Sequence, residues 1–201
     1  MISNLKKLIK LLIYGLINLF ISPSKEIKRK SLLLVRLDAI GDYVLFRNFI
    51  KLLKKNQKYN DYTITLLGNS VWKNLSKELD YEYVDDFIWL DRNKFHNNLI
   101  YRYKKLKEIT FYGYEIVINP AYSREFYYSD TIVKLLTANE KIGSISDTSN
   151  LNVFKNNVSD KYYTKLISTK KEIMFEFNRN KEFFEKLLEE NLLIVKPNIK
   201  L

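Results

Sequence analysis

Two aspartates flank a glycine in the segment Asp38-Ala39-Ile40-Gly41-Asp42, which directly follows an apolar run. A positioned carboxylate can take the proton of a hydroxyl group while its oxygen attacks an electrophile, which is general base catalysis. Gly41 permits a tight turn and the close approach of a ligand because it has no Cβ atom. The competing interpretation is that Asp38 or Asp42 is simply the N-cap of a helix, a common role of aspartate.

A second polar group follows another apolar run and Pro120, and it consists of Ser123 and Arg124 in the segment AYSRE. A guanidinium group suits phosphate or carboxylate groups of a ligand, and a serine hydroxyl can hydrogen-bond a sugar hydroxyl. The segment equally allows a salt bridge between Arg124 and Glu125 or a contact of Arg124 at the start of a helix. We therefore expect Arg124 either to face a binding cleft or to be paired within the protein.

These polar groups lie between segments that alternate between strand and helix patterns. Predicted strands cover 31–37, 62–68, 84–91, 114–120 and 140–145, and predicted helices cover 43–55, 70–79, 97–109, 124–137 and 171–190. Strands that alternate with helices imply right-handed crossovers and a parallel sheet. The sequence therefore predicts an α/β fold, a Rossmann-like parallel sheet flanked by helices. Residues 146–170 have little periodicity and are predicted to form a long loop with short pieces of structure.

In a parallel sheet, ligands bind at the carboxyl ends of the strands. Both polar groups follow predicted strands, so the same edge of the sheet is expected to hold them. The helix that starts near Gly41 presents free N–H groups, which favour anions. The backbone N–H groups of Ile40 and Gly41 are therefore candidates to hold a phosphate of a ligand.

Residue counts exclude several classes of chemistry. The 201 residues include no cysteine and only one histidine, His96. Disulfides, thiolate catalysis, cysteine metal sites and multi-histidine metal sites are therefore excluded, and His96 is expected to be a solvated surface residue. The pattern G-x-G-x-x-G is absent, so a nicotinamide cofactor is not supported. The acidic pair Asp85 and Asp86 enters a strand and is expected to be surface charge, not a metal motif.

The formal net charge of +11 lies mostly at one end of the chain. The basic residues of the segment 1–30, which face a single acidic residue, Glu26, are Lys6, Lys7, Lys10, Lys25, Lys28, Arg29 and Lys30. A nucleic-acid-binding domain more often spreads a basic stripe over its folded face. This distribution, together with the absence of a recognisable motif, argues against a nucleic-acid partner.

The segment 1–30 has the pattern of an amphipathic helix. Its uncharged apolar run, residues 11–21, is shorter than the roughly 20 residues that span a bilayer. At helical spacing, a polar stripe forms from Ser3, Lys7, Lys10, Tyr14 and Asn18, and the leucines away from it are Leu8, Leu12, Leu16 and Leu19. This pattern favours a helix in the membrane interface, with basic residues toward anionic headgroups. A helix packed on its own domain and a signal or anchor segment remain alternatives.

The segment LLLVRLDAIGDYVLFRNFIKLLKK, residues 32–55, resembles the opening of glycosyltransferase family 9, the heptosyltransferase-type enzymes of lipopolysaccharide assembly. Their first strand and turn carry the pattern I-x-R-L-D-A-I-G-D. Weaker similarities follow in the same order in INPAYSRE, in EKIGSISD and in FEFNRNKEFFEKL, which resembles the family's E-x-x-R-N helix. The resemblance extends from about residue 31 to the end of the sequence.

The resemblance implies the GT-B architecture, in which two Rossmann-like domains enclose the active site. This chain would be the amino-terminal half of such a glycosyltransferase. Residues 1–30 would form the membrane-interface helix and a basic linker, residues 31–190 the acceptor-side domain, and residues 191–201 an interdomain linker or a truncated end.

The resemblance also assigns roles to individual residues. Asp42 occupies the position of the catalytic base. Substrate-binding roles are expected for Asp38, Ile40, Gly41, Ser123 and Arg124. No cofactor and no metal ion are expected, because a nucleotide-sugar donor is the second substrate and the scheme needs no metal.

The implied partners are an anionic glycolipid acceptor, a nucleotide-sugar donor, the inner membrane surface and a separate donor-binding domain or chain. The expected location is cytoplasmic, peripheral on the inner face of the cytoplasmic membrane. Because most of the donor site would lie in the other half, the chain alone is expected to be inactive. The alternative function is a non-catalytic, membrane-associated module that binds a glycolipid or a nucleotide.

Overall fold

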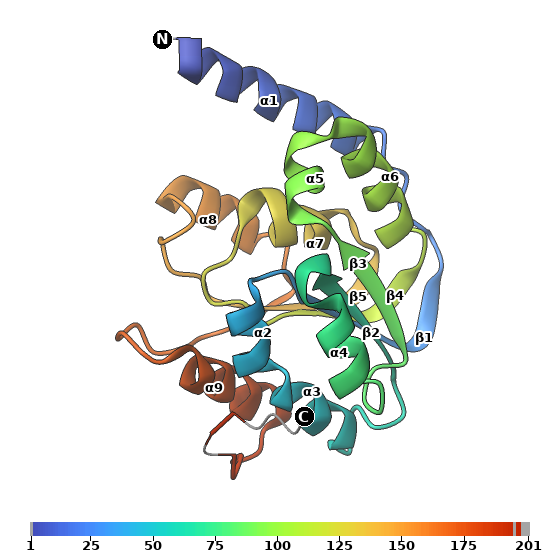
Figure 1. Cartoon of the computed structure of the whole chain (residues 1–201), viewed down its shortest axis with the longest axis vertical. Coiled ribbons are helices and arrows are strands. Elements are labelled where there is room, and N and C mark those ends of the chain that lie inside the picture. The colour runs from blue at the N-terminus through green and yellow to red at the C-terminus, as the bar shows by residue number, and fades with distance from the viewer. Residues whose placement is uncertain (1, 195, 198–201) are drawn as a thin grey trace.

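The computed structural model of the chain describes residues 2–194, 196 and 197, with side chains from residue 9 onward (Figure 1). Its centre is a six-stranded, all-parallel sheet with the order β3-β2-β1-β4-β5-β6. The strands are β1 (Ile27–Arg36), β2 (Thr63–Asn69), β3 (Asp86–Leu90), β4 (Gly113–Asn119), β5 (Ala138–Ser144) and β6 (Lys165–Ile167). The predicted Rossmann-like α/β fold is confirmed.

The central strand β1 is buried on both faces because helices cover both sides of the sheet. Leu32 and Leu34 point into one core, while Leu33 and Val35 point into the other, as the two-residue period of a strand requires. Leu34 is paired with Leu66 of β2 on one side and with Ile118 of β4 on the other. This double burial explains why the strand is a continuous apolar run instead of an alternating one.

Two helical layers enclose the sheet. One core lies under α2 (Ile40–Phe46), α3 (Asn48–Lys55) and α9 (Glu176–Leu188), with the short helix η1 (Ser70–Trp72) and α4 (Lys73–Leu79) beside them. The other core lies under α5 (Arg92–Asn97), α6 (Leu99–Ile109) and α7 (Thr131–Leu135). A short π-helical turn, η2 (Phe126–Asp130), leads into α7.

Several predicted boundaries were wrong. The predicted helix 43–55 divides at Arg47 into α2 and α3. The predicted loop 146–170 contains α8 (Val153–Asp160) and the edge strand β6. β6 has only three residues and partly exposed side chains, so its sequence shows no apolar alternation. β1 begins at Ile27, inside the range assigned to the linker.

The end of the chain also differs from the prediction in part. α9 starts at Glu176, so Ile173, which lies within the predicted helix 171–190, precedes the observed helix and is fully exposed. The segment 191–201 falls partly outside the described residues, and the division into domains remains a prediction.

The helix α1 (Ile2–Leu19) leads away from the rest of the molecule at its upper end in Figure 1. Its carboxyl-terminal part packs on α5 and α6, and Ile17 and Ile21 join the core beneath those helices. In the part of the chain that the structure describes, no helix has the length and the hydropathy needed to cross a membrane.

Candidate functional site

The turn that follows β1 lies at the carboxyl edge of the sheet and is held by side chains from neighbouring elements. The carbonyl oxygen of Leu37 accepts hydrogen bonds from Arg92 Nη1 at 2.9 Å and from Asn69 Nδ2 at 3.3 Å. The carbonyl oxygen of Asp38 accepts from Asn69 Nδ2 at 3.2 Å and from Trp72 Nε1 at 3.1 Å. The backbone that leads to Asp42 is therefore fixed before any ligand binds.

Asp42 lies in the first turn of α2, with its side chain partly exposed. Within the described residues, its carboxylate makes no hydrogen bond and no ion pair. Ala39 is the N-cap of α2, and no side chain caps the helix, so the interpretation of Asp38 or Asp42 as the N-cap was wrong. A partly exposed carboxylate without a fixed partner is free to accept a proton from a bound hydroxyl group.

Gly41 was expected to permit a tight turn, but the backbone of the structure does not require a glycine there. A Cβ atom added at Gly41 would meet no atom within 4 Å, and its φ angle is not positive. Gly41, Ala39 and Ile40 are all exposed, so the backbone here is open to solvent. Gly41 is therefore not required by the fold, although it leaves the surface beside Asp42 uncovered.

A buried arginine, Arg36, joins this turn to the last helix. Its guanidinium contacts Asp38 Oδ2 at 2.8 Å, Glu176 Oε1 at 2.9 Å and Asn180 Oδ1 at 3.2 Å, and it lies over the ring of Phe46. Burial acts to lower the pKa of Arg36. The negative charges of Asp38, Glu176 and, more weakly, Asp42 outweigh burial and raise this pKa, so the guanidinium stays charged.

The segment that resembles an E-x-x-R-N helix thus binds neighbouring parts of the fold together. Glu176 and Asn180 hold Arg36, and Arg179 donates hydrogen bonds to the carbonyl oxygens of Lys170 and Glu172. The Arg179 guanidinium also lies 4.0 Å from the centre of the Tyr122 ring. α9 therefore contacts both the turn after β1 and the segment after β4. Sequence reasoning missed Arg36, and the available signal was a charged residue at the end of a buried strand.

The prediction that Arg124 faces an open cleft was wrong. Its side chain is 0% exposed and contacts Asp160 of α8, Asn156 Oδ1 at 3.0 Å and, more distantly, Asp130. The guanidinium also lies over the ring of Tyr163. α8 covers this site, and the sequence had predicted a loop there.

The predicted salt bridge between Arg124 and Glu125 was also wrong. Glu125 instead forms a bidentate pair with Arg92, at 2.7 and 2.8 Å. Ser123 remains partly exposed and donates a hydrogen bond to Asp147 Oδ2 at 3.2 Å. Sequence reasoning did not find Arg92, which is partly exposed and links the turn after β1 to the segment after β4.

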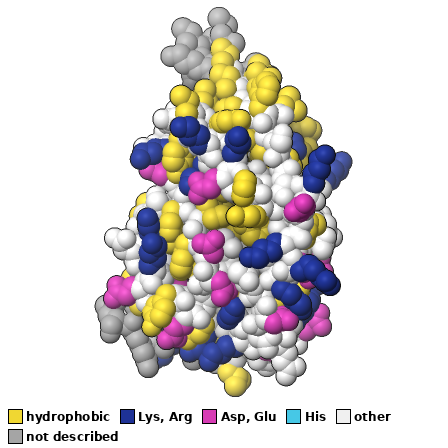
Figure 2. Space-filling model, turned by 90° about the vertical axis from the view of Figure 1, so that its right-hand side faces the viewer, with side chains coloured by type: hydrophobic (Ala, Val, Ile, Leu, Met, Phe, Trp, Pro, Cys, Tyr) yellow, Lys and Arg dark blue, Asp and Glu magenta, His cyan; other side chains and the backbone are white. Residues whose placement is uncertain are grey.

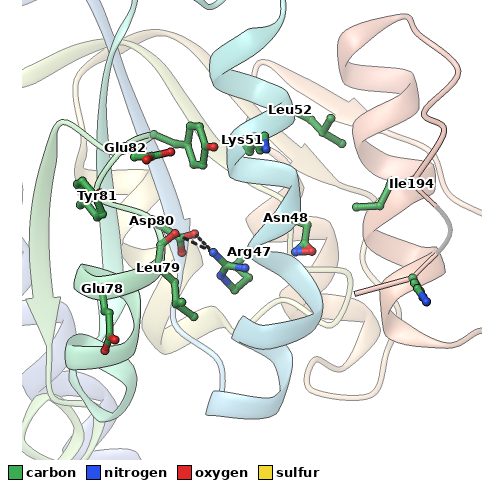
Figure 3. A pocket seen from close by; sticks show the side chains of 12 residues that line it. Arg47, Asn48, Lys51, Leu52, Glu78, Leu79, Asp80, Tyr81, Glu82 and Ile194 are labelled. Carbon is green, nitrogen blue, oxygen red and sulfur yellow. Dashed lines mark hydrogen bonds and ion pairs between the residues drawn. The ribbon is translucent and has the colours of Figure 1, made fainter. Parts of the chain in front are cut away.

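A pocket of about 680 Å³ lies elsewhere, between α3 and the segment that joins α4 to β3 (Figure 3). None of the predicted site residues lines it. At its base, Asp80 accepts hydrogen bonds from Arg47 Nη2 at 2.8 Å and from the Tyr43 hydroxyl. Burial raises the pKa of both Tyr43 and Asp80, which is expected of a buried, hydrogen-bonded structural cluster.

His96 is not the freely solvated histidine that the sequence predicted. Its ring is half-buried and stacks on Tyr128, with 6.1 Å between the ring centres. Its Nδ1 atom lies 3.4 Å from the Tyr14 hydroxyl of α1. Among the described residues, no group of three or more acidic, histidine or cysteine side chains is placed to hold a metal ion.

Comparison with known proteins gives matches at the level of structure. No family model matches the sequence, and no curated protein matches it. A glycosyl transferase of family 9 from Veillonella parvula superposes with a TM-score of 0.61 at 17% identity. The match covers 82% of this chain and 43% of the Veillonella chain. The E. coli heptosyltransferase WaaC with ADP-2-deoxy-2-fluoro heptose superposes with a TM-score of 0.61 at 14% identity. The match covers 85% of this chain and 50% of the WaaC chain.

A further structure, WaaC with ADP, has a TM-score of 0.57 at 14% identity. These likenesses show that the chain has a fold like that of the family 9 glycosyltransferases and heptosyltransferases. The chain spans about half the length of these solved structures.

Proposed function

We propose that this chain is the acceptor-side half of a nucleotide-sugar-dependent glycosyltransferase of the heptosyltransferase type. The observation that carries the proposal is Asp42, a partly exposed carboxylate that makes no hydrogen bond to any described residue, in a turn held by hydrogen bonds at the carboxyl edge of a glycosyltransferase-like sheet. In such sheets, this edge is where ligands bind. The resemblance of the segment around Asp42 to the family 9 motif gives that carboxylate the role of catalytic base.

The proposed reaction forms one glycosidic bond. The acceptor hydroxyl oxygen attacks the anomeric carbon of the donor sugar, and the bond from that carbon to the nucleotide phosphate breaks. Asp42 takes the hydroxyl proton as the oxygen attacks, which avoids a high-energy oxonium ion. Asp38 and the backbone N–H groups of Ile40 and Gly41, together with Ser123, are proposed substrate contacts.

The proposed substrates follow from the resemblance and from the neighbours. WaaC is a heptosyltransferase whose structures contain ADP or an ADP-linked fluoro heptose, so an ADP-activated heptose is the first donor to test. The proposed acceptor is an anionic lipopolysaccharide-type glycolipid at the inner face of the cytoplasmic membrane. Since the chain spans about half of these neighbours, a second domain or a separate chain is proposed to supply the donor site.

The decisive experiment is sugar transfer by the chain combined with its donor-binding half. Asp42→Asn removes the base with almost no change in size, and it should lower kcat by about 10²- to 10⁴-fold. Asp61→Asn is the matched control and should leave kcat unchanged, because this exposed aspartate lies two residues before β2, at the opposite edge of the parallel sheet. An Asp42→Asn protein that keeps most of its turnover would rule out the proposed base.

A non-catalytic binding module makes the opposite prediction. It would tolerate Asp42→Asn and would bind its ligand without a second half. Calorimetry of the chain alone with ADP separates the two functions. Tight binding of ADP by this chain alone, with no transfer from the combined halves, would favour the binding module.

A further inference from the structure

The helix α1 packs on the molecule through the side that carries Lys10, Tyr14 and Asn18, with Ile17 beside them. Tyr14 is only 3% exposed, and its hydroxyl donates a hydrogen bond to the His96 carbonyl oxygen. The guanidinium of Arg102 lies 4.0 Å from the centre of the Tyr14 ring, and Lys10 Nζ donates to Asn97 Oδ1 at 3.4 Å. A surface helix usually buries its most apolar side, whereas α1 turns its leucines away from the domain.

The opposite side of α1 is apolar and exposed. Leu12, Leu16 and Leu19 are 61%, 55% and 80% exposed, and they follow one another at helical spacing. Together with Ile9 and Phe20 they form what we call the outer face of α1. Figure 2 shows hydrophobic side chains gathered at this end of the molecule, with Lys and Arg side chains below them. A contiguous apolar patch of this kind marks a surface that binds a membrane or another molecule.

The charges around this face indicate what covers it. α1 contains no acidic residue. On the neighbouring helix α6, Lys104 and Lys107 are exposed, whereas Lys105 is paired with Glu108 and Arg102 is buried. An apolar helix face with exposed lysines beside it complements an anionic bilayer, where leucines enter the acyl boundary and cations meet headgroups. A second copy of the chain would bring two basic surfaces together, which is unfavourable.

We propose that the outer face of α1 docks the chain on an anionic membrane surface. The contacts of Tyr14 with His96 and Arg102 keep the leucines turned outward. The inference extends the proposed function, because a glycolipid acceptor lies in a bilayer, but it rests on the structure of α1 itself.

Contacts connect α1 to the carboxyl edge of the sheet, where the proposed site lies. Tyr14 contacts α5, which follows the carboxyl end of β3, and its ring lies 6.1 Å from that of Tyr127 in η2, which follows β4. His96 of α5 stacks on Tyr128, and Arg92 lies over the same ring while it holds the Leu37 carbonyl. α1 is therefore connected through α5 and η2 to the sheet edge that holds Asp42.

Flotation with lipid vesicles tests this proposal on the intact chain. The vesicles contain phosphatidylcholine with or without phosphatidylglycerol. The unaltered chain should float with the anionic vesicles and much less with the neutral ones. Replacing both Leu12 and Leu16 by serine should lower the vesicle-bound to free ratio by about 10-fold or more, because the inserted apolar area is lost.

The matched control is Ile173→Ser, which changes a fully exposed apolar residue three positions before α9, a helix that Figure 1 shows at the opposite end of the molecule from α1. It should float as the unaltered chain does. Circular dichroism checks that all variants are folded, which is expected because the altered side chains are exposed.

Several outcomes would overturn the proposal. One is a chain that never floats, and another is a double serine variant that floats as well as the parent. A third is a dimer in sedimentation analysis that the double serine variant converts to a monomer, because a second copy would then cover α1. Vesicle binding needs no donor and no base, so Asp42→Asn must float normally. A failure of transfer and a failure of docking are therefore distinguishable.

Discussion

The helices α1 and α9 are both amphipathic, yet they present opposite faces to the molecule. α9 buries Phe177, Phe183 and Phe184 against α2 and α3, whereas α1 buries Tyr14 and leaves its leucines exposed. The difference lies in the surface beneath each helix. Under α9, the rings of Phe46 and Phe49 pack against Phe184.

Under α1 the surface is partly polar, because Arg102 and the backbone of His96 meet the helix there, beside the apolar contact of Ile17. An amphipathic pattern therefore identifies two faces but does not say which of them packs on the domain. The receiving surface decides, and that surface is assembled from residues distant in the sequence.

The strongest test of this comparison is the removal of one apolar side chain from each helix. Phe184 is fully buried, so Phe184→Ala should lower the free energy of unfolding by about 3–5 kcal/mol. Leu16→Ala should change it by less than about 0.5 kcal/mol in the absence of lipid, because the side chain is exposed. Urea denaturation measures both values, and similar losses would mean that α1 does not leave its apolar face free.

A smaller effect is expected at the polar contact of α9. Glu176→Gln removes a charge that faces the buried Arg36, and it should cost about 1–3 kcal/mol in urea denaturation. The control, Glu172→Gln, alters an exposed residue in a weak pair with Lys170 and should be nearly neutral. An equal response of the two variants would show that Arg36 does not depend on α9.

The smallest effect concerns pH and the attachment of α1. Burial lowers the pKa of His96 from 6.5, with further lowering by the charges of Lys10 and Arg102. The unfolded chain therefore binds this proton more readily than the folded one, so stability decreases as pH falls below about 6.5. The Tm of the His96→Gln variant should fall less than the Tm of the parent when the pH is lowered from about 7.5 to about 5.5. A parallel decline of the two proteins would contradict this assignment.

The sequence was informative wherever one local pattern decides the structure. The runs around Leu34, Leu66 and Ile118 are apolar on both faces, so they specify buried parallel strands without reference to other segments. The turn at Asp42 could be placed because it directly follows such a strand. The short edge strand β6 and helix α8 lacked this signal, since their order depends on contacts with the rest of the sheet.

The partners of charged side chains could not be predicted in the same way. Arg124 is followed by an acidic residue in the sequence, yet it pairs with Asp160, 36 positions away. Arg36 pairs with Glu176 across 140 positions. The energy of a buried guanidinium depends on which carboxylates the fold brings within reach, and that is a property of the assembled layers.

The guanidinium under α9 has a mechanical consequence. If α9 moved away from the sheet, Arg36 would lose Glu176 and Asn180 and would keep only Asp38 as a charged partner. A buried guanidinium that loses partners is costly, so α9 and the turn that carries Asp42 should move together. Any protein surface that pressed on α9 would then also set the direction in which the Asp42 carboxylate points.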